Sequence, residues 1–302
     1  MRPGLTTAIV LGCGVLLLTG CVPSSINDAG TVASRLDDVV SGKDMITRFA
    51  VSPGDVSVVV RDRGQLSVRG SDLLNSEALP SGATTLGVLD TEAIDAQYDR
   101  LMASCQDSPV LRGYVAMTGT VVVSSWCGSG DESVVLESTL DGEPGINSSD
   151  QIDFLSAGGL DLFLRELRAL APGTEAFMVS LPGPASARGA SVVMHGKTWT
   201  QPDGTDCHVG LGLNGATSPH NPRVVTCLDK DPVVGKAREF TLTGIDAEKL
   251  HSELSRILDS SGFPRERVAY VGLYCEEPGS QEIEVIVFSD REERFRDSFL
   301  IL

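Results

Sequence analysis

Three segments of the chain repeat the same spacing of apolar residues behind an aspartate. They begin at Asp28, Asp90 and Asp246, and apolar residues stand four, eight, eleven and twelve positions after each aspartate. This spacing forms one apolar stripe along an α-helix, and an aspartate side chain can accept hydrogen bonds from the free backbone N–H groups of the first turn. We therefore predict three capped amphipathic helices. Their stripes are Val32, Leu36, Val39 and Val40 in the first, Ile94, Tyr98, Leu101 and Met102 in the second, and Leu250, Leu254, Ile257 and Leu258 in the third.

A fourth helix is predicted around Asp161, where Phe163, Leu167 and Leu170 follow a less regular spacing. Short runs rich in β-branched and aromatic residues follow each of the four helices and indicate strands. The second and third segments also agree beyond their helices, since Val115 follows Asp90 and Val271 follows Asp246 at the same distance of 25 positions. The expected strands are 48–51, 58–60, 114–117, 121–123, 134–136, 152–155, 178–181, 192–194, 270–273, 285–287 and 299–302.

These elements predict an α+β fold built of four tandem repeats. Each repeat would be a helix followed by two to four antiparallel strands, with the helices packed on one face of the sheets. The proline-rich stretch Leu181–Ser186 is the expected boundary, so one pair of repeats would span 28–183 and the rest 184–302. Amphipathic helices share their spacing by necessity, so an α+β protein without repeats is the alternative interpretation.

The first twenty-one residues have the pattern of an export signal. Arg2 precedes an apolar run from Ala8 to Leu18, which is too short for a permanent membrane helix. The segment Leu18-Thr19-Gly20-Cys21 resembles the lipobox of bacterial lipoproteins. The resemblance implies that residues 1–20 are a signal peptide, that lipid is attached to Cys21, and that 21–27 form a tether on the outer side of the cell membrane. An ordinary secretory signal cleaved nearby is the alternative.

Charge and composition restrict the partners of the protein. The chain has a net charge of −17, and removal of residues 1–20 would leave 23 basic and 41 acidic residues. Such a field repels nucleic acid and anionic lipid headgroups, so we expect no nucleic-acid partner and a membrane contact only through the lipid on Cys21. Arginine outnumbers lysine 19 to 5, which is typical of GC-rich genomes and, with the lipobox, indicates a Gram-positive actinobacterium.

Five cysteines follow Cys21, and cysteines outside the cytoplasm tend to pair. Cys207 and Cys227 are nearly equidistant from the turn signal at 218–222, so a hairpin centred there would place them opposite each other. Cys105 and Cys127 are the next candidate pair, and Cys275 is a rival partner for either pair. We predict disulfides Cys207–Cys227 and Cys105–Cys127.

The sequence motifs of nucleotide-binding proteins and hydrolases give no support for a cofactor or for catalysis. The glycine pattern of residues 210–215 matches a dinucleotide fingerprint, but prolines at 219 and 222 prevent the helix that such a site requires. A glycine-rich hairpin strand is therefore expected there, and no nucleotide. For hydrolases, neither GxSxG nor SxxK occurs in the sequence, although a Ser-His-Asp triad can assemble from distant segments.

Metal sites are also weakly supported. His195, His208 and His220 lie within 26 residues near two aspartates, but no HxH or HExxH pair presets two ligands on one element. They are weak candidates, and surface or turn histidines are the simpler interpretation. The segment 141–150 resembles a calcium loop, but it lacks the glycine and glutamate that an EF-hand requires, so an acidic turn is expected. We predict no metal and no cofactor.

These observations together favour a lipid-anchored binding or interaction module on the outer side of the membrane. Its partner would be an envelope protein or a glycan, because repeated units build extended recognition surfaces. A cell-envelope hydrolase whose site forms only in three dimensions is one alternative. A carrier of an apolar ligand is the other, and it would require a deep apolar cavity.

Overall fold

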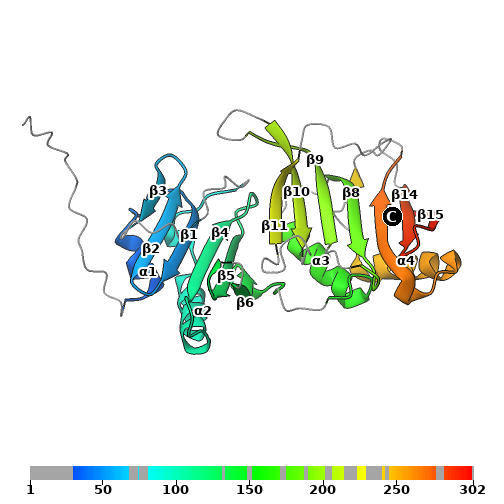
Figure 1. Ribbon diagram of the computed structural model, residues 1–302. Coiled ribbons are helices and arrows are strands. Elements are labelled where there is room, and N and C mark those ends of the chain that lie inside the picture. The colour runs from blue at the N-terminus through cyan, green and yellow to red at the C-terminus, as the bar shows by residue number, and fades with distance from the viewer. Residues whose placement is uncertain are drawn as a thin grey trace, which may run out of the picture.

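The fold was analysed in a computed structural model of the chain. It describes residues 30–67, 74, 81–130, 133–147, 152–170, 175–186, 190–200, 206–213, 223–228, 240–241, 245–276 and 282–300. These residues form four α-helices and two antiparallel sheets, one in each half of the chain (Figure 1). The predicted α+β class is therefore confirmed. The helices are α1 (Val32–Asp37), α2 (Thr91–Ser104), α3 (Ala157–Leu170) and α4 (Ala247–Ser261).

The first sheet contains the strands that follow α1 and α2. Its order is β3-β2-β1-β4-β5-β6-β7, so the first strand after each helix, β1 or β4, lies at the centre. Later strands are added outward on both sides through hairpins. The strands are β1 (Ile46–Ser52), β2 (Asp55–Val60), β3 (Gly64–Ser67), β4 (Val110–Val115), β5 (Val121–Cys127), β6 (Val134–Leu140) and β7 (Glu143–Pro144).

The second sheet follows the same rule with the strands after α3 and α4. Its order is β11-β10-β9-β8-β13-β14-β15, and β12 pairs with β8 off this path. Of the strand expected at 299–302, residues 299 and 300 lie in β15, and 301–302 lie outside the described residues. The strands are β8 (Glu175–Pro182), β9 (Ala190–Thr200), β10 (Asp206–Leu213), β11 (Arg223–Leu228), β12 (Phe240–Thr241), β13 (Val268–Tyr274), β14 (Glu282–Ser289) and β15 (Arg294–Leu300).

Two of the three predicted helix caps are confirmed. Asp90 accepts from the backbone N–H of Ala93, and Asp246 accepts from that of Lys249, each at 3.0 Å. In the first helix the N-cap is Thr31. The cap predicted at Asp28 is therefore wrong, and Asp28 itself lies outside the described residues.

Most residues of the predicted apolar stripes are buried. Val39 and Tyr98 are only partly buried, and Val39 and Val40 follow the end of α1 at Asp37. The clear exception lies in α2. Met102 of α2 is 42% exposed, whereas Ile94, Gln97 and Leu101 of the same helix are buried. These three residues define the packed face through steps of three and four positions, and Met102 lies about 100° round the helix from Leu101. The spacing rule therefore extended the stripe of α2 one residue too far.

The strand predicted at 152–155 is wrong. These residues form a turn that leads into α3, with Phe154 and Leu155 buried in the core. Ser156 follows and its hydroxyl accepts from the backbone N–H of Gly159, as an N-cap does. The apolar run thus anchors the entry of a helix, which a short stretch of sequence does not distinguish from a strand.

The predicted boundary at 183/184 falls inside the second sheet. Residues 183–186 follow β8, and β8 pairs with the next strand, β9. The change from one sheet to the other lies earlier, between β7 and β8. The proline-rich stretch therefore marks a connection between neighbouring strands of one sheet.

Two groups of buried side chains form the interior. In the first, Val32 and Leu36 of α1 and Ile94 of α2 pack with strand residues such as Phe49. In the second, α3 and α4 pack with the strands of the second sheet. Strand β5 contributes to both groups, because Val121 and Val123 belong to the first and Val122 to the second. Alternate side chains of a strand point to opposite faces, so both faces of β5 are covered.

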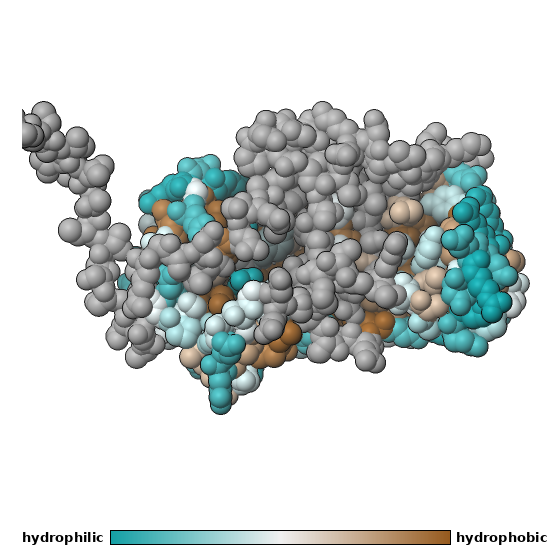
Figure 2. All heavy atoms as spheres, viewed as in Figure 1, coloured by the Kyte–Doolittle hydropathy of each residue, from teal (hydrophilic) through white to brown (hydrophobic). Residues whose placement is uncertain are grey.

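Hydrophilic residues cover the end of the molecule formed by α4 and β15. Figure 2 shows hydrophilic residues gathered at the end where α4 and β15 lie. Several ion pairs occur there, such as that between Arg256 of α4 and Asp297 of β15, 2.9 Å apart. None of the helices in the described part of the chain has the length and apolar character needed to cross a membrane.

Candidate binding site

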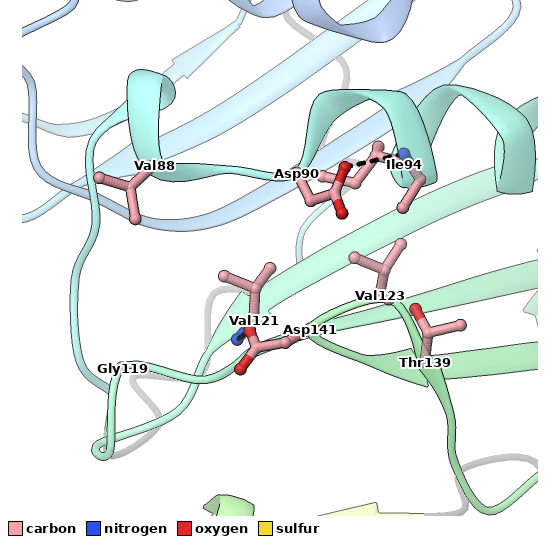
Figure 3. Close-up of a pocket in the computed structure, with 10 residues that line it drawn as sticks. Val88, Asp90, Ile94, Gly119, Val121, Val123, Thr139 and Asp141 are labelled. Atoms are coloured by element: carbon pink, nitrogen blue, oxygen red, sulfur yellow. Dashed lines mark hydrogen bonds between the residues drawn. The ribbon is translucent and has the colours of Figure 1, made fainter.

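A pocket of about 320 Å³ lies between the N-terminus of α2 and strands β5 and β6 (Figure 3). We call it the α2–β5 pocket. Its apolar wall consists of Ile94 from α2 with Val121 and Val123 from β5. Val88, at the end of the short 3-10 helix Leu86–Val88, lines the pocket and is 73% exposed. The pocket therefore offers an apolar surface that solvent can reach.

Two carboxylates line this apolar surface. One Asp90 oxygen caps α2, and one Asp141 oxygen accepts from the backbone N–H of Val121 at 2.8 Å. In Figure 3 the two aspartates lie on either side of the pocket, with Val121 and Val123 between them. Each carboxylate is therefore held in place by the backbone beside it, and the pair adds negative charge to an apolar cleft.

The turn that carries Asp141 has a left-handed backbone conformation. Asp141 and Gly142 have φ values of +47° and +84°, in the left-handed region that favours glycine and tolerates aspartate. A Cβ atom on Gly142 would lie 3.5 Å from the Cβ of Ala93 and 3.7 Å from Oδ2 of Asp90. The turn after β6 thus lies against the first turn of α2 and closes one side of the pocket.

A buried glutamine connects α2 to the strands beside the pocket. The side-chain amide of Gln97 donates to the carbonyl of Val123 (3.3 Å) and to the hydroxyl of Ser125 (3.2 Å). Its oxygen accepts from the hydroxyl of Thr139, a pocket residue on β6, at 2.9 Å. Buried polar groups with satisfied hydrogen bonds fix one arrangement of the elements they join. The Gln97 network therefore fixes α2 against β5 and β6.

The predicted Cys105–Cys127 disulfide is present and fixes the other end of α2. Cys105 directly follows the helix, Cys127 ends β5, and their Cα atoms are 5.6 Å apart. Helix α2 is thus held to its surroundings at its N-terminus, at its middle and at its C-terminus. A pocket built on rigid elements in this way is preorganised for binding.

The turns around the pocket also contact the second half of the chain. The hydroxyl of Thr118, next to the pocket residue Gly119, donates to the carbonyl of Ala169 in α3. The guanidinium of Arg165 donates to the carbonyl of Pro144 at 2.9 Å. These bonds attach the margin of the pocket to α3.

The other predicted site residues do not form a second site in the described part of the chain. Cys21 and His220 lie outside the described residues, and only the backbone of His195 in β9 and His208 in β10 is described. Among the described residues, no group of three His, Cys, Asp or Glu side chains is arranged to hold a metal ion. Residues 210–213 of the glycine motif lie in strand β10, as the hairpin interpretation expected.

The hairpin that carries Cys207 and Cys227 is present, but its register differs from the expected one. Cys227 of β11 pairs with Val209 of β10, two positions along the strand from Cys207. The predicted Cys207–Cys227 disulfide falls on side chains outside the described part and stays a prediction. Cys275, the rival partner, is buried at the end of β13.

The pocket itself was not predicted from the sequence. Asp90 was expected only as a helix cap, and Asp141 only as part of an acidic turn. The Asp141-Gly142 dipeptide after a strand was the local signal for a left-handed turn. The meeting of this turn with the α2 N-terminus follows from the strand order.

Comparisons with known proteins give little further information. No family model matches the chain, and no curated protein matches it. A crystal structure of the PCNA2–PCNA3 complex from Sulfolobus tokodaii shows a weak similarity, with 7% identity over 89% of this chain and 93% of that chain. The TM-score is 0.17, and we base no conclusion on it.

Proposed function

We propose that the protein is a lipid-anchored binding protein on the outer side of the membrane. In this proposal the α2–β5 pocket recognises a basic side chain of an envelope protein. The observation that supports it is the apolar pocket lined by two fixed carboxylates, Asp90 and Asp141. A lysine or arginine side chain matches this chemistry, because its methylene stem packs on apolar surface while its charged group stays near solvent.

The charge of the whole chain supports the same ligand class. A net charge of −17 attracts cations and accelerates their association. The two alternatives have less support from the pocket. At about 320 Å³ it is at the small end of ligand pockets, which disfavours a carrier of a large apolar ligand. Its lining contains no histidine or cysteine, and the Thr139 hydroxyl donates to Gln97, which disfavours a hydrolytic centre there.

We also propose that the four helix-and-strand groups are tandem repeats with their helices on one face of each sheet. The element order supports this, because every helix is followed by at least three strands. The sheet order supports it too, because the first strand after each helix occupies a central position. Membrane attachment through Cys21 remains part of the proposal, since residues 22–29 leave only a short tether before the described part.

The pocket proposal is tested with a small cation of the right shape. Binding of n-pentylamine to the full chain is measured by ligand-observed NMR, with uncharged 1-pentanol as the control ligand. Asp90→Asn and Asp141→Asn remove the charges but keep a side-chain oxygen for each backbone bond, and asparagine tolerates both backbone conformations. Asp62→Asn, at an exposed turn, is the matched control for net charge.

Pentylamine should bind saturably and more tightly than pentanol. Each pocket substitution should weaken pentylamine binding about two- to fivefold, because exposed or half-exposed ion pairs contribute up to about 1 kcal/mol. The Asp62 variant should bind like the wild type. Equal binding of amine and alcohol, or an equal effect of all three substitutions, would refute recognition of a basic group. Membrane attachment is tested separately, since Cys21→Ala should release folded protein from the membrane fraction.

A further inference from the structure

Arg112 of β4 lies on the opposite face of the first sheet from the α2–β5 pocket. Its guanidinium lies over the indole ring of Trp126 in β5, with 4.8 Å between Cζ and the ring centre. Its Nε atom is buried and has no hydrogen-bond acceptor among the described residues. The preceding residue, Leu111, points into the core beneath α1 and α2. Because successive side chains of a strand point to opposite faces, Arg112 points away from that core.

Arg112 also lacks a counter-charge among the residues that the structure describes. No Asp or Glu in the described ranges forms an ion pair with it, and burial alone lowers the pKa of its guanidinium. Half-buried charges without a partner are costly, so proteins normally pair or expose them. This arrangement is unusual in a chain with a net charge of −17, where acidic side chains are abundant.

The residues in register with Arg112 have small side chains. Ala50, Ser124 and Ser138 stand in register with it on the neighbouring strands, and all three are small. Beyond them, on β6, Leu136 is 41% exposed and stands at the register shift, next to Val135, which pairs with Trp126. Val134 pairs with Cys127, which is bonded to Cys105 at the end of α2, so Val134 lies on the α2 face of the sheet. The strand next to Trp126 thus carries one exposed apolar side chain at the level of this cation–aromatic pair.

We propose that Arg112 and Trp126 bind a carboxylate that is flanked by apolar side chains on a partner protein. The guanidinium offers paired N–H donors in the geometry of a carboxylate, and the indole ring fixes their direction. The bound carboxylate supplies a counter-charge for Arg112, and Leu136 contacts an apolar neighbour of the carboxylate. This site does not depend on the α2–β5 pocket, because Val121 and Val123 face the pocket from the other side of β5.

The test uses a short peptide as the probe. N-acetyl-leucyl-leucine with a free carboxylate, and the same peptide as its C-terminal amide, are titrated into the full chain. Binding is followed through the NMR signals of the Arg112 Nε–H and the Trp126 indole N–H. Inorganic phosphate and phosphatidylglycerol vesicles are titrated in parallel, because a phosphate group could also pair with an arginine.

Three variants distinguish recognition from a structural role. Arg112→Met removes the charge and keeps much of the stem, and Arg112→Lys keeps the charge but loses the paired donors. Arg61→Met, at an exposed position after β2, is the matched control. The urea midpoint of every variant is measured beside its affinity, so that loss of binding is separated from loss of folding.

The free carboxylate peptide should shift both signals saturably, and the amide should not. Arg112→Met should weaken binding at least about tenfold, because a truncated charge pair at an interface costs this much or more. It should not lower the urea midpoint, since it removes a half-buried charge that has no counter-charge in the described part of the chain. Arg112→Lys should fall between wild type and Arg112→Met, and Arg61→Met should match the wild type.

The proposal fails if the amide binds as well as the free carboxylate. It also fails if Arg112→Met binds normally, or if both Arg112 variants lose stability, because the arginine would then be structural. Binding of phosphate or of the vesicles in preference to the peptide would refute the proposal that the partner is a protein. None of these outcomes depends on pentylamine binding in the α2–β5 pocket.

Discussion

Removal of the Cys105–Cys127 disulfide should destabilise the first core without changing its fold. The substitution pair is Cys105→Ala with Cys127→Ala, because alanine leaves no polar group at the buried Cys105 position. The hydrogen bonds of Gln97 and the Asp90 cap remain in this variant. What is lost is mainly the constraint that the bond places on the unfolded chain.

The expected loss follows from the length of the closed loop. The two cysteines are 22 positions apart. In the chain-entropy model a loop of about this length contributes about 3 kcal/mol at 25 °C. Because Gln97 and Asp90 still hold the helix, we expect the C-terminal turn of α2 to open first.

The assay combines equilibrium urea unfolding with hydrogen exchange measured by mass spectrometry. Amides of α2 and β5 should lose protection by about 3 kcal/mol, while amides of α4, which packs in the other core, serve as the internal reference. Reduction of the wild type should give the same change in α2. A loss below about 1 kcal/mol, or equal losses in α2 and α4, would refute the reasoning from loop entropy.

Two further predictions concern the strands. Gly113→Ala should destabilise the first core by about 1–3 kcal/mol in urea unfolding, because a Cβ there would lie 2.0 Å from the ring of Phe49. The same substitution should cost less stability in a Phe49→Leu background, where the ring is absent. An unchanged loss would contradict the steric cause. Burial, followed by the nearby Glu276 and Glu282, raises the pKa of Glu284 above its ordinary value of 4.5. The folded state therefore holds the proton more tightly than the unfolded state, and the stability this contributes is present below pH 4.5 and is lost as the pH rises through the folded-state value. Glu284→Gln should remove this pH-dependent loss of stability, so the urea midpoints of variant and wild type should diverge as the pH rises from 4 to 7. A constant difference between the two midpoints over this pH range would contradict the raised pKa of Glu284.

Local chemistry made much of the fold predictable. Asp90 and Asp246 each cap a helix with their own side chain, so the signal and the structure lie within four residues. The errors arose where one pattern fits two structures. The apolar run at Phe154 and Leu155 fits a strand or the entry of a helix, and only packing against α3 decides between them.

The candidate sites were less predictable than the elements that carry them. Asp90 and Asp141 are 51 positions apart and come together because β5 and β6 lie beside α2. Each residue also has a sufficient local role, as a cap or as a turn, so neither stood out in the sequence. The contact between Arg112 and Trp126 likewise requires the register of β4 with β5, which the sequence alone does not specify.

The central position of β1, β4, β8 and β13 has a consequence for the order of folding. Hairpins such as β1–β2 join residues a few positions apart, whereas the central pair β1–β4 joins Arg48 to Tyr114, and β8–β13 joins Leu181 to Val271. Closing a longer loop costs more entropy, so we expect the outer hairpins to form early and the central pairs to form last. Until then each half-sheet exposes an unpaired inner edge, and that edge is the place where the newly made chain is most prone to aggregate.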